Sequence, residues 1–173
     1  DALTGVTLMF PIYMLMVALS GLVSAGVSSI YARLLGAARY DEAGAVYGQA
    51  LFLGMIVSLG LISLFVAGGQ QTILQMASGS TILATSGYDY ISVLIGCSFL
   101  IFMLPINIDA LRCEGLLRIM ATVSITSAFL NIGFDYLFVV VMQQCVAGSA
   151  WGTVLAQTCS LLAIVSSRWF GIP

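Results

Sequence analysis

One segment of the chain places an acid and several small polar side chains within an otherwise apolar run. Asp135 is the only acid well inside a stretch apolar enough to cross a membrane. Asn131 lies four residues earlier on the same helical face, which Ser127 and Ser124 continue. A carboxylate beside an amide can bind a hard monovalent cation, and loss of solvation on burial favours the protonated acid. The pattern therefore predicts a site for Na+ or H+.

The same residues could instead serve only to pack helices together. Polar side chains in membrane helices commonly hydrogen-bond neighbouring helices, and Asp135 and Asn131 could do no more than this. An ionisable group is costly to place inside a membrane, however, and packing alone could be achieved with Leu. We therefore favour a functional role for Asp135.

Two further polar residues are candidate ligands. Asn107 follows Pro105 by two residues, where a kink would free backbone carbonyls to act as ligands. Thr153 lies beside a stripe of small residues at four-residue spacing, and its hydroxyl could turn toward Asp135. Asn107 is thus a candidate ligand of a second site, and Thr153 a candidate partner of Asp135.

The composition argues against several other kinds of chemistry. The chain has no His, which excludes a His-based catalytic triad or dyad. Its four Cys are far apart, without the spacing of a metal cluster or a disulfide scaffold. A membrane aspartyl protease would need two facing acids, but Asp89 is expected at the outer mouth of its helix, away from Asp135. With a net charge of −2 and no basic stripe, we expect neither an enzyme nor a nucleic-acid-binding protein, and no cofactor.

The overall composition predicts a protein whose solvent is lipid. Hydrophobic residues make up 61% of the 173 residues and charged residues only 7%, whereas a soluble domain is about 45–50% apolar and about 25% charged. Five basic and seven acidic side chains cannot cover the water-facing surface of a globule of this length. We therefore predict an all-α, polytopic transmembrane helix bundle.

Five stretches reach the roughly 20 apolar residues that a membrane-spanning helix needs. They cover residues 3–32, 43–68, 88–111, 119–142 and 150–168. Pro11 should bend the first of these helices and Pro105 the third. The polar segment 69–87 could form a short helix that lies at the membrane interface.

The arginines predict how the bundle is oriented. Those between or after the spans are Arg33, Arg39, Arg112, Arg118 and Arg168. All five fall on one side of the membrane, and the connections on the opposite side carry none. Because cationic side chains near helix ends are retained in the cytoplasm, we expect this side to be cytoplasmic. The first span then begins outside, and if the full chain starts in the cytoplasm, we expect an odd number of helices, most simply one, to precede it.

A repeated motif marks two of the predicted turns. Residues 33–39 and 112–118 both read Arg-x-x-Gly-x-x-Arg, and each lies between the end of one helix and the start of the next. The glycine is expected to end its helix in a left-handed conformation, and Asp41 to cap the helix after the first copy. We expect Asp109 to pair with Arg112. Tight cytoplasmic helix hairpins explain both copies, and gating contacts with a second lobe are the alternative.

Several runs of sequence resemble the multidrug and toxic compound extrusion (MATE) family. Residues 21–37 resemble the second helix and following turn of that family, and 111–115 the turn after its fourth helix. Residues 131–135, Asn-Ile-Gly-Phe-Asp, resemble its fifth helix, and 146–153 the start of its sixth. The order, spacing and membrane side of these runs agree along nearly the whole chain.

The resemblance implies a fold of twelve helices in two six-helix lobes that exports amphipathic, often cationic compounds in exchange for H+ or Na+. This chain would be a partial N-terminal lobe, helices two to six, whose partners are the first helix and the second lobe in the plasma membrane, most simply the inner membrane of a bacterium. In the family an Asn and an Asp of the fifth helix form the coupling-ion site, matching Asn131 and Asp135. An Asn of the fourth helix and a Thr of the sixth would match Asn107 and Thr153, and an acid of the first helix would complete the site.

Two other functions remain open from the sequence. A lipid-linked saccharide flippase of the same superfamily would share the architecture, but it usually carries more cationic side chains in its cavity, and here no Arg lies in mid-span. A membrane scaffold that transports nothing predicts that Asp135 can be replaced without loss.

Overall fold

The computed structural model describes residues 2–76, 81–142 and 145–169, and every regular element in these ranges is a helix. The helices are α1 (Ala2–Gly36), α2 (Tyr40–Met76), α3 (Thr81–Gly96), α4 (Ser98–Cys113), α5 (Leu117–Asp135), a π-helical segment η1 (Tyr136–Val141) and α6 (Cys145–Trp169). The predicted all-α fold class is confirmed.

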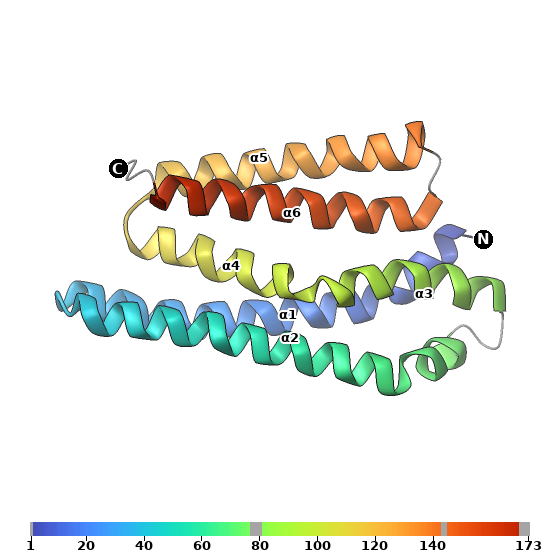
Figure 1. Ribbon diagram of the computed structural model, residues 1–173, viewed down its shortest axis with the longest axis horizontal. Coiled ribbons are helices and arrows are strands. Elements are labelled where there is room, and N and C mark those ends of the chain that lie inside the picture. The colour runs from blue at the N-terminus through green and yellow to red at the C-terminus, as the bar shows by residue number, and fades with distance from the viewer. Residues whose placement is uncertain (1, 77–80, 143–144, 170–173) are drawn as a thin grey trace.

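The helices lie side by side along one long direction (Figure 1). α1 packs against α2 and α4, whereas α5 packs mainly against α6. The central element is α4, in which nine of 16 residues are buried, and the most peripheral is α5, in which only Val123 is buried. The large apolar side chains that cover the outside of the bundle, such as Phe52, Leu64 and Phe129, suit contact with lipid.

The turns that carry the arginines lie together. The α1–α2 turn, the α4–α5 turn and the last turn of α6 are at one end of the bundle, and the start of α1, the end of α2 and the start of α6 are at the other (Figure 1). The sequence prediction that all five arginines share one side of the bundle therefore agrees with the arrangement of the helices.

Among the described residues, four helical segments are long and apolar enough to cross a membrane. They are Met9–Gly36, Tyr40–Gly69, Leu117–Val141 and Gly148–Trp169. The fifth predicted span is a bent pair, in which Gly87–Gly96 of α3 and Ser98–Cys113 of α4 meet at 52°. The bundle thus has five spans when the bent pair counts as one.

The sequence predicted a bend at Pro105, but the bend in this span lies elsewhere. α4 continues through Pro105, and the break lies eight residues earlier at Cys97, where the Leu100 N–H donates to the Cys97 carbonyl over only three residues. Proline has no N–H, so the Ile101 carbonyl loses its helical partner. The Ser20 hydroxyl of α1 donates to that carbonyl at 2.8 Å. The Ser20 hydroxyl thus replaces the missing backbone donor, and α4 continues through Pro105 without a break.

The predicted interfacial helix is not a separate element in the described residues. α2 continues through Met76, and α3 begins at Thr81, so most of segment 69–87 belongs to these two helices, while residues 77–80 lie outside the described ranges. The Thr72 hydroxyl donates to the Gly68 carbonyl within the extended part of α2. The polar residues that begin segment 69–87 therefore indicate where α2 leaves the apolar layer of the membrane, and not where the helix ends.

The second arginine motif forms the turn that its glycine predicts. Gly115 has a φ of +79°, and the Leu116 N–H donates to the Leu111 carbonyl at 3.0 Å. This bond across five residues is typical of a Schellman motif, in which glycine takes the left-handed position without steric cost.

The first motif forms the same turn two residues later than predicted. α1 includes Gly36, and Ala38 takes the left-handed conformation with a φ of +56°. The Arg39 N–H donates to the Leu34 carbonyl at 3.0 Å, which is the same Schellman bond. α2 begins at Tyr40, so Asp41 lies in its first turn instead of at its cap. An alanine therefore occupies the position that normally requires glycine.

Candidate functional site

Asp135 lies where α5 changes its helical pitch. It is the last residue of α5, and the π-helical segment η1 begins at the next residue. The Met142 N–H donates to the Leu137 carbonyl across five residues at 2.9 Å, which is the wider π-type turn. Such segments are rare and occur frequently at functional sites.

Helix α6 passes unusually close to this acid at Gly152. A Cβ atom on Gly152 would overlap Oδ1 of Asp135 and would lie 3.1 Å from the Asp135 backbone nitrogen and 3.3 Å from the Phe134 carbonyl carbon. The absence of a side chain therefore lets the two backbones approach and leaves room for the carboxylate.

The immediate partners of Asp135 leave one of its oxygens free. The Ser149 side chain hydrogen-bonds the carboxylate. Oδ1 is buried and has no hydrogen-bond partner among the described residues. A buried carboxylate oxygen without a partner is unusual, because it carries the cost of lost solvation with no compensation. It is the kind of group that a proton or a cation can satisfy.

Asn131 and Thr153 lie beside the acid and are bonded to each other. Asn131 Nδ2 donates to Thr153 Oγ1 at 3.3 Å, and the Thr153 hydroxyl donates to the Ser149 carbonyl at 3.2 Å. Through Ser149, these bonds link Asn131 and Thr153 to Asp135. The structure thus brings together three of the four predicted ion-site residues, all on α5 and α6.

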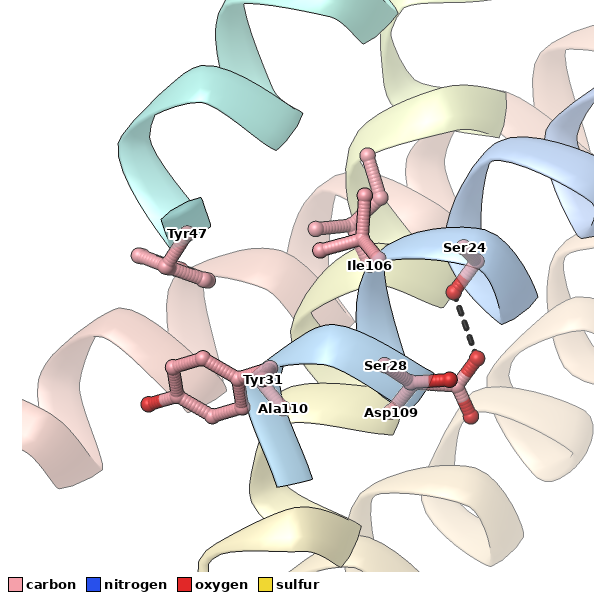
Figure 2. Close-up of a pocket in the computed structure, with 8 residues that line it drawn as sticks. Ser24, Ser28, Tyr31, Tyr47, Ile106, Asp109 and Ala110 are labelled. Atoms are coloured by element: carbon pink, nitrogen blue, oxygen red, sulfur yellow. Dashed lines mark hydrogen bonds between the residues drawn. The ribbon is translucent and has the colours of Figure 1, made fainter. Parts of the chain in front are cut away.

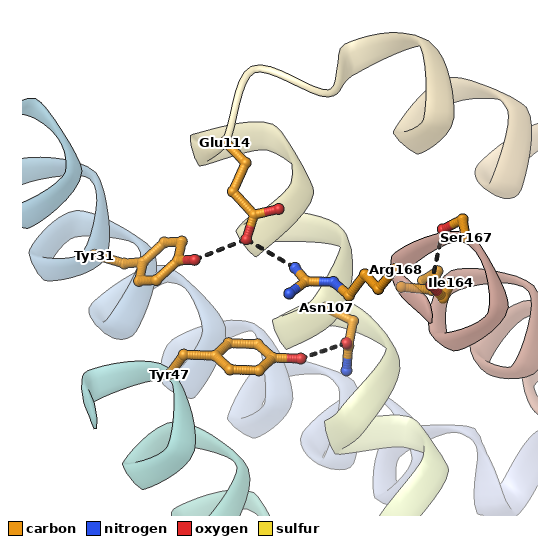
Figure 3. A network of polar contacts seen from close by, with 7 residues as sticks. All are labelled: Tyr31, Tyr47, Asn107, Glu114, Ile164, Ser167 and Arg168. Atoms are coloured by element: carbon orange, nitrogen blue, oxygen red, sulfur yellow. Dashed lines mark hydrogen bonds and ion pairs between the residues drawn. The ribbon is translucent and has the colours of Figure 1, made fainter. Parts of the chain in front are cut away.

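The fourth predicted residue, Asn107, is engaged elsewhere. Its Oδ1 accepts a bond from the Tyr47 hydroxyl of α2 at 2.6 Å (Figure 3). Its Nδ2 donates to the Met103 carbonyl at 2.9 Å, and the residue is 5% exposed. The side chain of Asn107 is therefore committed to α2 and to its own helix, and the structure does not place it with Asp135.

A polar pocket of about 390 Å³ opens beside the ion-site residues. Its polar lining residues are Tyr13, Ser124, Ser127, Asn131, Thr153 and Gln157, and its apolar ones are Leu104, Ile108, Ala128 and Ala156. The predicted stripe of Ser124, Ser127 and Asn131 thus lines one wall. Gln157 was missed by sequence reasoning, although it lies one turn after Thr153 on α6, and its buried Oε1 has no hydrogen-bond partner among the described residues.

The chemistry of these groups suits a hard monovalent ion better than a transition metal. The carboxylate of Asp135 and the hydroxyls of Ser149 and Thr153 lie at the α5–α6 interface beside the Asn131 side chain, which carries an amide oxygen. Within the described ranges no group of three His, Cys, Asp or Glu side chains could hold a metal ion.

A second polar network joins four helices at the arginine-bearing end. Glu114 Oε1 accepts bonds from the Tyr31 hydroxyl at 2.7 Å and from Arg168 at 2.9 Å (Figure 3). The Arg168 guanidinium also lies 5.1 Å from the centroid of the Tyr47 ring, within cation–π range. Sequence reasoning used Arg168 only to orient the bundle and did not find this network, because its members are far apart along the chain.

Asp109 belongs to this end of the bundle as well. It forms the expected ion pair with Arg112 at 3.0 Å, and its Oδ2 also accepts a bond from the Ser24 hydroxyl at 2.5 Å (Figure 2). The cavity beside it has a volume of only about 10 Å³, the size of a single water molecule. The predicted pairing of Asp109 with Arg112 is confirmed.

Comparison with known proteins identifies the family. The MatE family model matches residues 1–137. The chain belongs to the MatE (MATE) family. Among curated proteins, none gives a match.

Solved MATE structures share this fold. An inward-facing multidrug resistance MATE family transporter of the MOP superfamily is 25% identical with a TM-score of 0.88, and the alignment covers 95% of this chain and 37% of that one. An outward-facing structure of such a transporter gives 25% identity, a TM-score of 0.88, and 98% and 37% coverage. A MATE structure in complex with Br-NRF gives 25% identity, a TM-score of 0.85, and 96% and 38% coverage. The chain therefore spans a little over a third of the length of these transporters, as expected for a MATE fragment.

Proposed function

We propose that this chain is the partial N-terminal lobe of an antiporter that exports drugs or other amphipathic, often cationic compounds in exchange for H+ or Na+. The observation that carries the proposal is the buried, unpartnered Oδ1 of Asp135, beside Asn131 and Thr153. Helix packing alone would not require it, because an acid used as packing glue would have both oxygens bonded.

In this proposal the coupling ion alternates with the substrate. H+ or Na+ binds at Asp135, with Asn131 and Thr153 as neutral ligands, and the substrate binds in the adjacent polar pocket. A first helix with a further acid and a second lobe complete the transporter in the plasma membrane, where alternating access arises from movement of one lobe against the other. Similarity to a multidrug resistance MATE family transporter and to a MATE in complex with Br-NRF supports a small-molecule substrate.

The flippase alternative receives less support from the geometry. Phosphate-bearing headgroups are bound by cationic side chains, but none of the residues that line the polar pocket is charged. The scaffold alternative leaves the unpartnered carboxylate oxygen of Asp135 without an explanation.

The experiment is ion-driven efflux by the full-length protein in liposomes, with Asp135→Asn as the test variant. This change keeps the shape of the side chain and removes its charge, so we expect efflux to be lost while the protein still inserts and folds. Asp89→Asn is the matched control, because Asp89 is exposed on α3. Full efflux by a well-folded Asp135→Asn protein would refute the site and favour a packing role.

A further inference from the structure

The polar pocket contains an acceptor that nothing in the described protein satisfies. Oε1 of Gln157 is buried and unbonded, although five other polar residues line the same pocket. We propose that Gln157 is a specificity-determining residue, whose Oε1 accepts a hydrogen bond from an N–H donor on a drug-sized substrate in this pocket. The inference rests on the proposed transport function, and it concerns which substrates are chosen.

Two neighbouring polar side chains are already engaged, whereas Oε1 of Gln157 is buried without a partner. The Thr153 hydroxyl donates to the Ser149 carbonyl, and Asn131 donates to Thr153. Gln157 lies one helical turn beyond Thr153, so a ligand bonded to it would sit directly beside the Asn131–Thr153 pair. A packing role at this position would be served better by Met or Leu, which have no acceptor to leave unbonded.

The walls of the pocket indicate the class of ligand. Its volume of about 390 Å³ lies within the range of sites for drug-sized molecules, roughly 300–1,000 Å³. The apolar lining residues, which include Leu104 and Ile108, suit a ring system. None of the lining residues is charged, so this pocket distinguishes ligands by their hydrogen-bond donors and not by their charge. A fused-ring compound with amino groups fits these requirements.

Two acridinium cations separate the hydrogen bond from charge and shape. 3,6-Diamino-10-methylacridinium and 10-methylacridinium have the same ring system and the same permanent charge, but only the first carries N–H donors. Binding of each is measured by fluorescence titration of the purified full-length protein, either unchanged or as Gln157→Met. Gln49→Met is the matched control, because Gln49 is exposed on α2 and does not line the pocket.

We expect Gln157→Met to weaken binding of the diamino compound by about tenfold, the upper end for one neutral hydrogen bond. Binding of 10-methylacridinium should change by less than about twofold, because this compound has no N–H to donate to Gln157. Gln49→Met should not alter the binding of either compound. The melting temperature of Gln157→Met should not fall, because the substitution removes no bond from the unliganded protein. Gln157→Leu provides a second variant with the same expected pattern.

Three results would overturn the inference: equal weakening of both ligands, an unchanged preference for the diamino compound, or no binding of either compound to the unchanged protein. Efflux by Asp135→Asn is scored separately and reports on the proposed function. If Asp135→Asn loses efflux but Gln157→Met keeps the ligand preference of the unchanged protein, the proposed antiport stands and the role of Gln157 is rejected. If Asp135→Asn keeps full efflux while Gln157→Met selectively loses binding of the diamino compound, the ion site at Asp135 is rejected and the role of Gln157 stands.

Discussion

Replacing Gly152 by Ala tests whether the close approach of α5 and α6 builds the ion site. The added Cβ would overlap the Asp135 carboxylate and would press on two backbone atoms of α5, at 3.1 and 3.3 Å. The carboxylate can rotate away, but the backbone atoms can move only with their helix. The two helices must therefore separate by a few tenths of an ångström.

The magnitude follows from two opposing effects. Overpacking of this kind costs about 1–3 kcal/mol, and the backbone contacts place Gly152 toward the upper value. Replacement of a helical glycine by Ala returns about 1 kcal/mol. We therefore expect Gly152→Ala to lower the free energy of unfolding by about 2 kcal/mol.

Gly60→Ala is the control for the effect of helix propensity alone. A Cβ at Gly60 of α2 would meet nothing within 4 Å, so this variant should be more stable than the unchanged protein by about 1 kcal/mol. The two variants should thus differ by about 3 kcal/mol. Denaturant titration of the full-length protein in detergent measures the difference, and efflux in liposomes should fall for Gly152→Ala only. If the two alanine variants are equally stable, the argument from close approach is refuted.

Three other predictions concern the arginine-bearing end. Ala38→Gly should raise the free energy of unfolding by about 1 kcal/mol in the same titration, because Ala38 has a φ of +56°; a decrease would contradict the Schellman assignment. A double-mutant cycle of Glu114→Gln and Arg168→Met should give a coupling of about 1 kcal/mol, since the pair is only partly exposed, and a coupling near zero would show that the network adds no stability. In intact cells, an impermeant thiol reagent should label Met142→Cys and not Glu42→Cys in a full-length protein without other cysteines; the opposite pattern would invert the topology.

The part of the fold that the sequence predicts well depends on long apolar runs. Each of the five predicted ranges lies largely within an observed helix or bent pair, because lipid demands that the backbone bond within its own segment. The ends of helices were less predictable. Gly36 is the last residue of α1, but the left-handed residue of the following Schellman turn is Ala38 and not the glycine.

The bend in the third span shows a limit of a different kind. Pro105 is a reliable signal that one carbonyl loses its partner, but the sequence does not show that Ser20, 81 residues from the Ile101 carbonyl, supplies a replacement. The same limit explains Asn107 and Gln157. Asn107 accepts a hydrogen bond from Tyr47 of α2. Oε1 of Gln157 has no bond, and it lies in a pocket that only the assembled helices create. Polar partners that are distant in sequence decide which candidates stay free.

The proposed ion site lies within a single helical hairpin, α5–α6. The contacts of Asp135 with Ser149 and Gly152, and the bond from Asn131 to Thr153, join α5 to α6, and that bond spans only 22 residues. Contacts of such short range form early, because little chain entropy is lost in closing them. The polar pocket, in contrast, is also lined by Tyr13 of α1 and Leu104 of α4. These helices lie outside the hairpin and must pack against it to complete the pocket. We therefore expect the proposed ion site to depend on one helical hairpin alone, and the proposed substrate pocket to form only when α1 and α4 have packed against that hairpin.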